Sequence, residues 1–376
     1  MKKKIVLVSP AFPYRGGQAL VEAHLFHALT QLGYDCHTLT FTLLYPKVFF
    51  PGSSQYDQSG KTFYAHSERI YRIINSINPF TWIQAARRIK SLNPDITLFV
   101  WWMPFFGPAY TVIAWLVKKW SKSKIVFLVE NYISHENRWF DKISSKVTLD
   151  QADAYIGQSE FIRNSIQKLH KKPVYKTTLS VYDCYNLGAF TKETAKAQFK
   201  IQQPKTVLFF GLIRRYKGLD KLIEAMQYLE DDISLLAAGE CYEDIAYYED
   251  LIQKFGVGAK VRLVNQFIPN EEIEPYFKSA DIVILPYNSA SQSGILMMAY
   301  GFNKPVMVND VGGLSELVVE GKTGFVMPNN DPKTIAQAIV KFYENDQEDY
   351  HGNIANLNEK LGYGNLEDIM TTILQK

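Results

Sequence analysis

The sequence predicts an α/β protein with two doubly wound domains, and three observations support this prediction. The chain has 376 residues, a length that suits two domains better than one. Short apolar runs alternate with amphipathic stretches in both halves, as expected where buried parallel strands alternate with helices. The alternation weakens between about residues 171 and 204, which are rich in Lys, Thr and turn residues, and it then restarts.

The first half begins with a short apolar run at residues 4–8, which predicts a buried strand. An amphipathic helix is expected from about Ala19 to Leu32, with Gly33 at its end. Further strands of the same parallel sheet are expected at residues 36–42, 96–102, 125–129 and 154–157. We assign residues 1–180 to this domain.

The second half repeats the pattern. Strands are expected at residues 206–210, 233–239, 261–264, 281–286 and 305–309. Helices are expected at residues 218–229, 242–255, 273–279, from 294 onward, 331–344 and 364–374. We assign residues 181–355 to the second domain and residues 356–376 to a C-terminal helix that could cross back to the first domain.

One segment has the length of a membrane span, because Ile96 to Val117 contains no charged residue. Pro104, Gly107 and Pro108 interrupt it, so a strand, a turn and a helix from Ala109 to Trp120 explain it better.

The apolar run at the N-terminus is too short for a signal peptide. The three cysteines Cys36, Cys184 and Cys241 are far apart and lack metal-ligand spacing, so we expect them to be reduced. Both observations favour a cytoplasmic location.

The net charge of +3 conceals an asymmetry, since residues 1–190 carry +11 and the remainder −8. The basic half predicts contact with an anionic membrane surface or with an acceptor that carries phosphate. A solvated basic surface without a partner is the alternative. Nucleic acid is the partner least supported, because the basic residues are scattered and form no recognisable motif. Aromatic residues that could face a membrane are Trp101, Trp102, Phe105 and Phe106, with core packing as the alternative.

The most informative segment lies around Gly294. An apolar strand ends at Pro286, a small hydroxyl-rich loop follows, and a short apolar helix leaves that loop. Backbone N–H groups and hydroxyls at a helix N-terminus suit a phosphate group. The loop residues Ser291, Gln292, Ser293 and Gly294 therefore predict a diphosphate cradle, although phosphate-loop and Rossmann glycine patterns are absent.

Arg214 and Lys217 lie between an expected strand and an expected helix of the generally acidic second half. Two cations there can neutralise a leaving diphosphate as its charge grows, with Arg as a fork and Lys as a point charge. The alternative is an ordinary solvated loop. Two further polar loops follow strands, one at residues 9–17 and one at 239–242, which contains Glu240.

Several motifs recur in an order that resembles one large family. They are Pro13-Tyr-Arg-Gly-Gly, Phe210-Gly-Leu-Ile-Arg-Arg-Tyr-Lys-Gly, Ala238-Gly-Glu, Ala280-Asp-Ile-Val-Ile-Leu-Pro-Tyr, Ala299-Tyr-Gly-Phe-Asn-Lys-Pro-Val and Val311-Gly-Gly-Leu-Ser-Glu-Leu-Val. Over nearly the whole chain, the sequence resembles the group 1 retaining glycosyltransferases with the GT-B fold. The resemblance implies two Rossmann-like domains that face each other across a cleft. It also implies sugar transfer from a nucleotide-sugar donor to a glycan or lipid-linked acceptor, as in polysaccharide biosynthesis, with retention of configuration.

The resemblance also implies roles for particular residues. Gly16 and Gly17 would let the backbone approach the donor diphosphate, which Arg214 and Lys217 would hold during catalysis. Ser293 and Gly294 would bind it through backbone N–H groups. The remaining donor-side residues, which include a segment that would meet the nucleotide base and a carboxylate near the donor, are Glu240, Phe267, Ile268, Ser291, Gln292 and Glu316.

The chain departs from the family pattern at two positions. The family often has two glutamates eight residues apart, one for the sugar and one for the ribose, and Ala290 and Met298 stand at these positions here. The usual Arg after the first glycine is replaced by Leu212, and Arg214 could substitute for it. We interpret Ser291 to Gly294 as an arrangement in which hydroxyls and amides do more of the donor binding.

A polar loop follows the strand at residues 125–129 and is expected to lie on the acceptor side. It contains Asn131, His135, Glu136 and Arg138. His135 could contact the sugar or polarise the acceptor hydroxyl, or it could be a structural loop histidine.

No Asp-x-Asp motif and no His/Cys/carboxylate cluster with metal spacing occurs in the sequence, so no essential metal and no cofactor are expected. Two other functions stay open. One is a non-catalytic subunit that binds a nucleotide sugar, which the missing glutamates favour. The other is an epimerase that acts on the nucleotide sugar alone, which the same absence disfavours.

Overall fold

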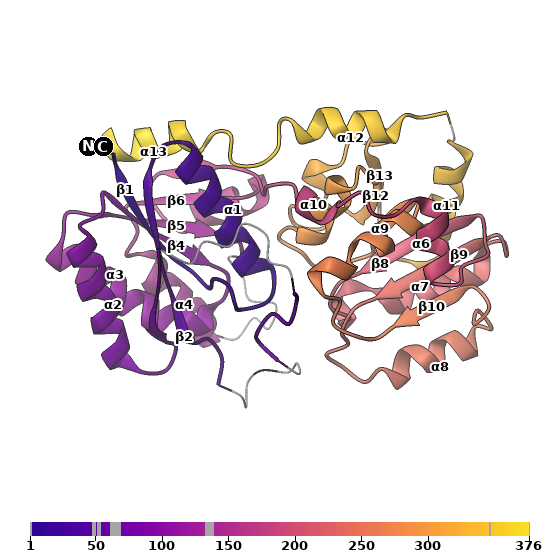
Figure 1. Cartoon of the computed structure of the whole chain (residues 1–376), viewed down its shortest axis with the longest axis horizontal. Coiled ribbons are helices and arrows are strands. Elements are labelled where there is room, and N and C mark those ends of the chain that lie inside the picture. The colour runs from indigo at the N-terminus through magenta and orange to yellow at the C-terminus, as the bar shows by residue number, and fades with distance from the viewer. Residues whose placement is uncertain are drawn as a thin grey trace. The chain divides into compact units, whose positions relative to one another are not determined.

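The computed structural model describes residues 2–46, 50, 54–60, 69–131, 139–345 and 347–375. The chain forms two compact units (Figure 1). Unit 1 contains residues 1–57, 63–180 and 362–376, and unit 2 contains residues 58–62 and 181–361.

Unit 1 is built on a parallel sheet of seven strands in the order β3-β2-β1-β4-β5-β6-β7. The strands are β1 (Lys4–Val8), β2 (Asp35–Leu43), β3 (Ile70–Asn75), β4 (Ile96–Trp101), β5 (Lys124–Val129), β6 (Ala154–Gly157) and β7 (Val174–Lys176). The central strands β1, β4 and β5 are almost wholly buried, which explains their continuous apolar runs.

The helices of unit 1 are α1 (Gly17–Gln31), α2 (Pro79–Leu92), α3 (Gly107–Trp120), α4 (Trp139–Leu149), α5 (Glu160–Gln167) and α13 (Leu366–Gln375). Helix α2 was not expected from the sequence, yet its ends carry strong signals. The Asn78 side chain accepts a hydrogen bond from the backbone N–H of Phe80, Pro79 occupies the first turn, and Asn93 ends the helix in a left-handed conformation.

The uncharged segment from Ile96 to Val117 forms β4, a turn and most of α3, as predicted. Among the described residues, no helix is long and apolar enough to cross a bilayer. For its aromatic residues, the alternative of core packing is confirmed. Trp101 and Phe106 are fully buried, Trp102 is nearly so, and Phe105 packs against the same core, because the strand end and the turn lie beneath Phe41 of β2.

The last segment of the chain is part of unit 1. Tyr363 accepts a hydrogen bond from the Gln158 side chain at 3.2 Å, and the Asn365 side chain donates to the carbonyl of Lys176 at 2.7 Å. The apolar face of α13 is buried through Leu366, Ile369, Met370 and Ile373. The chain therefore returns to unit 1 after unit 2 is complete.

Unit 2 has a parallel sheet of six strands in the order β10-β9-β8-β11-β12-β13. The strands are β8 (Lys205–Phe210), β9 (Ile233–Ala238), β10 (Val261–Val264), β11 (Ile282–Leu285), β12 (Val306–Asn309) and β13 (Gly324–Met327). The helices are α6 (Lys192–Gln198), α7 (Leu219–Ala225), α8 (Ala246–Lys254), α9 (Glu274–Ser279), α10 (Gly294–Gly301), α11 (Pro332–Glu344) and α12 (Tyr350–Asn358).

The expected domain boundary at residue 355 falls inside α12. The side chain of Asn358, at the end of this helix, donates a hydrogen bond to the carbonyl of Tyr300 in α10, so unit 2 extends to Leu361.

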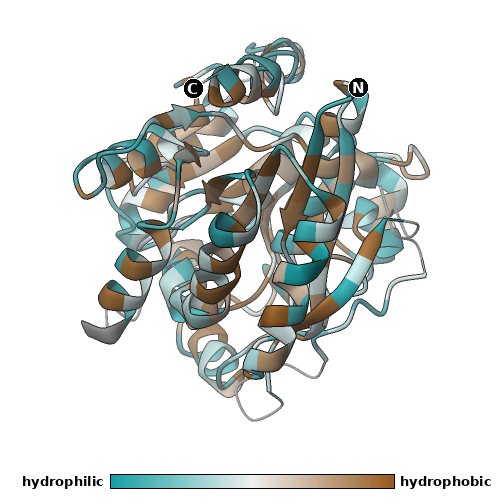
Figure 2. Ribbon diagram, turned by 90° about the vertical axis from the view of Figure 1, so that its left-hand side faces the viewer, coloured by the Kyte–Doolittle hydropathy of each residue, from teal (hydrophilic) through white to brown (hydrophobic). Residues whose placement is uncertain are grey.

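Both sheets confirm the doubly wound α/β prediction. Figure 2 shows largely brown strands and helices banded in brown and teal, as expected where one helix face packs on a sheet. The strand order reverses between β1 and β4 in unit 1 and between β8 and β11 in unit 2. In such sheets, ligands bind beyond the carboxyl ends of the strands at these reversal points.

Candidate functional site

The strongest candidate site lies at the reversal point of unit 2, where the loops after β8 and β11 pack together. The backbone N–H of Asn288 donates to the carbonyl of Tyr216 at 2.7 Å. Gly218 has a φ of +71°, and a Cβ on it would lie 2.1 Å from the carbonyl oxygen of Pro286. Only glycine permits both this backbone conformation and this close approach, so Gly218 holds the two loops in contact.

Lys217 is a buried cation in the loop after β8, with only 9% of its surface exposed. Among the described residues, its ammonium has no hydrogen-bond or ion-pair partner, and it lies 5.5 Å from the centroid of the Tyr287 ring. Burial, together with the nearby charge of Arg214, lowers the pKa of Lys217 to about 8. Burying a cation without a counter-charge lowers the stability of the fold, which indicates that this site binds an anion.

Arg214 is the second cation of this pair. Its Nε is buried and has no hydrogen-bond partner in the part of the chain that the structure describes, and its guanidinium lies 5.0 Å from the Tyr242 ring centroid. The neighbouring Arg215 differs, because it forms an ion pair with Glu243 at 3.5 Å and stacks on Tyr247. Arg215 is therefore neutralised within the protein, whereas no residue in the described ranges neutralises Arg214 or Lys217.

The N-terminus of α10 lies near Lys217. Ser293 caps the helix, and its hydroxyl accepts a hydrogen bond from the backbone N–H of Ile295 at 3.2 Å. A Cβ on Gly211, at the end of β8, would lie 3.1 Å from the side chain of Ile295 and 3.5 Å from the ammonium of Lys217. The structure thus brings together Lys217 and the helix start at Ser293 and Gly294, two features that the sequence places some 76 residues apart.

The loop before α10 is braced by the loop after β12. Gly312 has a φ of +57°, and a Cβ on it would lie 1.6 Å from the carbonyl oxygen of Ala290. The backbone N–H of Gly313 donates to the carbonyl of Ser291 at 3.2 Å, and Gln292 follows in the same loop. Glu316 lies in the short turn Ser315–Leu317 just beyond, so it belongs to the bracing loop.

The two positions where the family often has glutamates are apolar in structure as well as in sequence. Met298 is buried inside α10, and Ala290 contributes its carbonyl to the contact with Gly312. Neither residue offers a group that could bind a ribose or sugar hydroxyl through its side chain.

The other donor-side residues of unit 2 follow β9 and β10. The carbonyl of Glu240 accepts a hydrogen bond from the backbone N–H of Ile213 at 3.0 Å, which ties its loop to the loop of Lys217. Phe267 is half-buried, whereas Ile268 is buried and presents little surface to a ligand.

The predicted residues of unit 1 belong to a separate group. Gly16 caps α1 with a φ of +104°, and a Cβ on Gly16 or Gly17 would meet no atom within 4 Å, so the backbone is open there. Asn131 follows β5 and is half-buried. His135, Glu136 and Arg138 lie outside the described residues.

Sequence reasoning missed a buried carboxyl group, Glu130, which follows β5 immediately before Asn131. It also missed Tyr287, a buried residue whose ring centroid lies 5.5 Å from the ammonium of Lys217. The only signal for Glu130 was a carboxylate directly after an apolar strand, a pattern that surface loops share.

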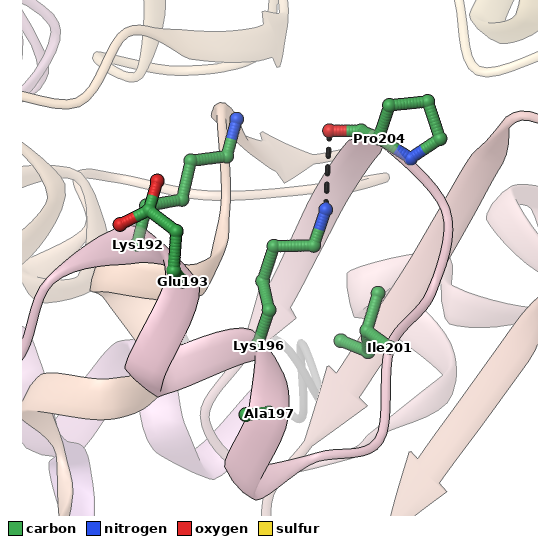
Figure 3. Close-up of a pocket in the computed structure, with 6 residues that line it drawn as sticks. All are labelled: Lys192, Glu193, Lys196, Ala197, Ile201 and Pro204. Atoms are coloured by element: carbon green, nitrogen blue, oxygen red, sulfur yellow. Dashed lines mark hydrogen bonds between the residues drawn. The ribbon is translucent and has the colours of Figure 1, made fainter.

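A pocket of about 390 Å³ lies at the opposite, amino-terminal edge of the unit 2 sheet. Figure 3 shows Lys196 donating to the carbonyl of Pro204, at 3.1 Å, and Lys192 on the same helix forms an ion pair with Asp281. Both lysines are thus already paired with groups of the protein, which distinguishes this pocket from the site at Lys217.

No group of three or more His, Cys, Asp and Glu side chains suited to a metal ion occurs in the described parts of the chain.

Residues 191–360 match the family described as "Glycosyl transferases group 1". The chain is similar to the D-inositol 3-phosphate glycosyltransferase of Corynebacterium urealyticum, with 23% identity over 265 residues, which cover 63% of this chain and 61% of that protein. It is 30% identical to the protein of the same description from Corynebacterium efficiens, over 38% of this chain and 35% of the other. These matches thus span less than two thirds of each relative.

Solved structures resemble the whole chain. Sucrose-phosphate synthase from Thermosynechococcus elongatus superposes with a TM-score of 0.75 at 18% identity, over 100% of this chain and 98% of the other. HepE from Anabaena, solved in complex with UDP, superposes with a TM-score of 0.76 at 14% identity, over 99% of both chains. At such identities the similarity concerns the fold.

Proposed function

Because residues 191–360 belong to the group 1 glycosyl transferases and the whole chain has the GT-B fold, we propose that this protein is a retaining glycosyltransferase. It moves a sugar from a nucleotide-sugar donor to a glycan or lipid-linked acceptor. The observation that carries the proposal is the pair Arg214 and Lys217, two cations without a counter-charge among the described residues, of which Lys217 lies near the N-terminus of α10.

The pair is suited to the chemistry of the leaving group. As the bond between the anomeric carbon and the phosphate oxygen breaks, negative charge develops on the nucleoside diphosphate. Lys217, Arg214 and the amides at the start of α10 can stabilise that charge without reorganisation, because the fold already holds them in place. Since no metal cluster is needed for this role, we propose that the reaction proceeds without an essential metal or cofactor.

The donor is proposed to bind to unit 2 through its diphosphate. HepE, which shares the fold, was solved with UDP and with UDP-glucose, and this supports a nucleotide sugar as the ligand. Arg214, Lys217, Ser293 and Gly294 would hold the diphosphate, and Phe267 is proposed to meet the base. Because Ala290 and Met298 supply no carboxylate, Ser291, Gln292 and Glu316 are proposed to contact the sugar and ribose.

The acceptor is proposed to bind to unit 1. Two relatives are described as D-inositol 3-phosphate glycosyltransferases, which supports a trial of phosphorylated polyols beside glycans and lipid-linked sugars. His135 stays a predicted acceptor-side residue, together with Asn131, Glu136 and Arg138.

An anionic membrane surface is a further proposed partner of unit 1, in line with the +11 charge of residues 1–190 and a cytoplasmic location at the inner face of a membrane. Exposed apolar side chains support this on three helices, namely Phe80 of α2, Trp115 of α3 and Ile143 of α4. Sedimentation with phosphatidylglycerol vesicles should exceed that with phosphatidylcholine vesicles, and the difference should shrink at high salt. Equal sedimentation with the two kinds of vesicle would rule out an anionic membrane as a partner.

The central experiment follows nucleotide release from a panel of UDP-, GDP- and dTDP-sugars, with and without acceptor candidates. Lys217→Ala and Arg214→Ala should each lower turnover about 100-fold or more, because each removes a charge that stabilises the transition state. Arg215→Ala is the matched control in the same loop, since Glu243 already neutralises Arg215, and its turnover should stay within a few fold. No release from any donor, or equal losses in all three variants, would overturn the proposal.

Retention of configuration and independence from metal ions each need a separate measurement. Proton NMR of the freshly formed product should show the anomeric configuration of the donor, whereas an inverted product would refute retention. Turnover should persist in EDTA, and a requirement for added Mn²⁺ or Mg²⁺ would show that a metal shares the work of the two cations.

A non-catalytic subunit that binds a nucleotide sugar is the second candidate, because Ala290 and Met298 replace the carboxylates that the family often uses. It would bind a nucleotide sugar tightly in a titration and yet release no nucleotide with any acceptor. That combination of results would favour this function over the transferase.

A further inference from the structure

Glu130 is a buried carboxyl group that the proposed donor chemistry does not use. It follows β5 in unit 1, and its backbone N–H donates to the carbonyl of Trp101, the last residue of β4, at 2.9 Å. The residue therefore lies at the carboxyl edge of the sheet, one strand from the reversal point between β1 and β4. Only 8% of its surface is exposed.

Only one of the two carboxyl oxygens of Glu130 has a hydrogen-bond partner among the described residues. Its Oε2 accepts a hydrogen bond from the side chain of Gln18, in the first turn of α1, at 3.2 Å. Its Oε1 has no partner within the described residues, and no lysine or arginine described there pairs with it. The titratable groups that face it are the phenols of Tyr110 in α3 and Tyr363 before α13, and neither is a cation. Burial accordingly raises the pKa of Glu130 to about 7.

Two other buried carboxylates show what a structural role looks like in this protein. Glu22, in α1, accepts a hydrogen bond from the hydroxyl of Thr38. Glu274, in α9, accepts two from the backbone N–H of Ala189, at 3.1 and 3.2 Å. Both tie separate segments of the fold together, whereas one oxygen of Glu130 has no partner in the part of the chain that the structure describes. A buried polar atom left without a partner costs stability, which suggests a function other than folding.

The start of α1 beside Gln18 is open. Gln18, whose side chain holds the Glu130 carboxyl group, directly follows Gly16 and Gly17, where an added Cβ would meet nothing within 4 Å. A ligand at this edge could therefore reach the helix start and the carboxyl group together.

We propose that Glu130 binds a hydroxyl group of the acceptor through its unpartnered Oε1, while Gln18 positions the carboxyl group through the other oxygen. This inference rests on the proposed function, because it assumes that unit 1 binds the acceptor. A hydroxyl is the ligand group that fits, since it can donate to an ionised carboxylate and accept from a protonated one. A phosphate would instead bring a second negative charge against the ionised form.

The test measures acceptor binding without turnover. Full-length wild-type protein, Glu130→Ala, Glu130→Gln and the control Glu22→Gln are titrated by saturation-transfer NMR with myo-inositol and with methyl α- and β-hexopyranosides as neutral polyol probes. Glu130→Ala should weaken binding about tenfold or more, the size expected for one hydrogen bond to a carboxyl group. Glu130→Gln keeps one donor and one acceptor, so it should lose only a few fold. Glu22→Gln should bind as the wild type does.

A pH series separates a contact with the ligand from a purely structural effect. Polyol affinity of the wild type should change between pH 6 and 8 as Glu130 ionises, and Glu130→Gln should abolish this change, while Glu22→Gln should keep it. The affinity for UDP should stay within twofold in all variants, because the diphosphate binds to unit 2.

Four outcomes would overturn the inference. They are unchanged polyol binding in Glu130→Ala, an equal loss in Glu22→Gln, an equal loss of UDP affinity in Glu130→Ala, and no binding of any probe by the wild type. Circular dichroism checks that the variants are folded. If Glu130→Ala does not fold, Glu130→Gln, whose side chain has the same shape, replaces it in the test. Failure of the proposed function would look different, because no nucleotide would be released from any donor whatever the polyol titrations show.

Discussion

Lys217 and Arg215 lie two positions apart in one loop, and the contrast between their partners explains why only one of them is placed in the site. Glu243 satisfies Arg215, whereas Lys217 faces a tyrosine ring and the charge of Arg214. The basic type of both residues is visible in the sequence. Their partners are not, because those partners come from the loops after β9 and β11.

The pKa of Lys217 should report a bound diphosphate directly. It is lowered to about 8 in the free protein, and an anion beside the ammonium favours the charged form, so UDP should raise it. By the same linkage, the affinity for UDP should fall as the pH rises above about 8. NMR titration of the lysine side chains with and without saturating UDP measures the shift. A pKa that UDP leaves unchanged would place the diphosphate elsewhere.

Glu130 should make the stability of unit 1 depend on pH. Its pKa is raised from 4.5 to about 7 in the folded state, so folding favours the protonated form. The stabilisation is fully present below about pH 4.5 and is lost as the pH rises through 7. Glu130→Gln cannot ionise and should be more stable than the wild type at pH 8 by about 1–3 kcal/mol. Denaturant unfolding at pH 5 and pH 8 tests this. Glu22→Gln serves as the control, since it should lose stability at pH 8 where Glu130→Gln gains it.

The site residues that could be predicted from the sequence are those that form a recognisable pattern with the residues next to them. The small residues before α10 predicted a helix start, and Ser293 does cap that helix. Glu130 and Tyr287 had no such signal, because whether a polar side chain is buried depends on elements distant in sequence. Ile268 is a different case, since the family resemblance implied a contact with the donor and its side chain is buried.

At the scale of elements, the contact between the loops after β11 and β12 should control donor binding. An alanine at Gly312 would place its Cβ against the carbonyl of Ala290, so the loop before α10 would have to move. Gly312→Ala should therefore weaken UDP binding and lower the free energy of unfolding by about 1–3 kcal/mol. Isothermal titration with UDP and denaturant unfolding measure the two effects.

Gly321→Ala is the matched control for this substitution. Gly321 also has a positive φ, +71°, but an added Cβ there would meet nothing within 4 Å. It should share the backbone strain and keep the wild-type UDP affinity. Equal UDP affinity in both variants would show that the bracing contact does not shape the site.

The strands that were predicted correctly are mostly those buried on both faces, such as β4 and β9, where the apolar run is continuous. Strand β3 was missed because it is only half-buried and carries Arg72. Strand β7 was missed because it spans only 3 residues, all half-buried. Strand β13 was missed as well, although four-residue strands such as β11 and β12 were predicted. Short and half-exposed elements owe their conformation to the neighbouring strand more than to their own residues.

At the scale of the whole molecule, the two α/β units could be predicted because the strand and helix alternation is interrupted once, near residues 171–204, and then repeats. Helix α12 was not anticipated, and with it the extent of unit 2 was misjudged. The particular sugar and acceptor could not be predicted, because a few side chains in a pocket determine them and the fold does not.

The C-terminal segment should be essential to unit 1. Met370 and Ile373 of α13 are buried, so Met370→Ala and Ile373→Ala should each lower the free energy of unfolding of unit 1 by about 2–4 kcal/mol. Gln375→Ala, at an exposed position of the same helix, should change it little. Hydrogen exchange resolved by peptide assigns the loss to a unit. Faster exchange confined to unit 2 in the first two variants would contradict the assignment.

The return of residues 362–376 to unit 1 also sets an order of events during synthesis. Every residue of unit 2 leaves the ribosome before α13 does, so unit 2 can close while unit 1 still lacks a helix. Unit 1 is thus synthesised first but completed last. A nascent chain stalled before α13 would expose the part of unit 1 that this helix covers to chaperones and proteases.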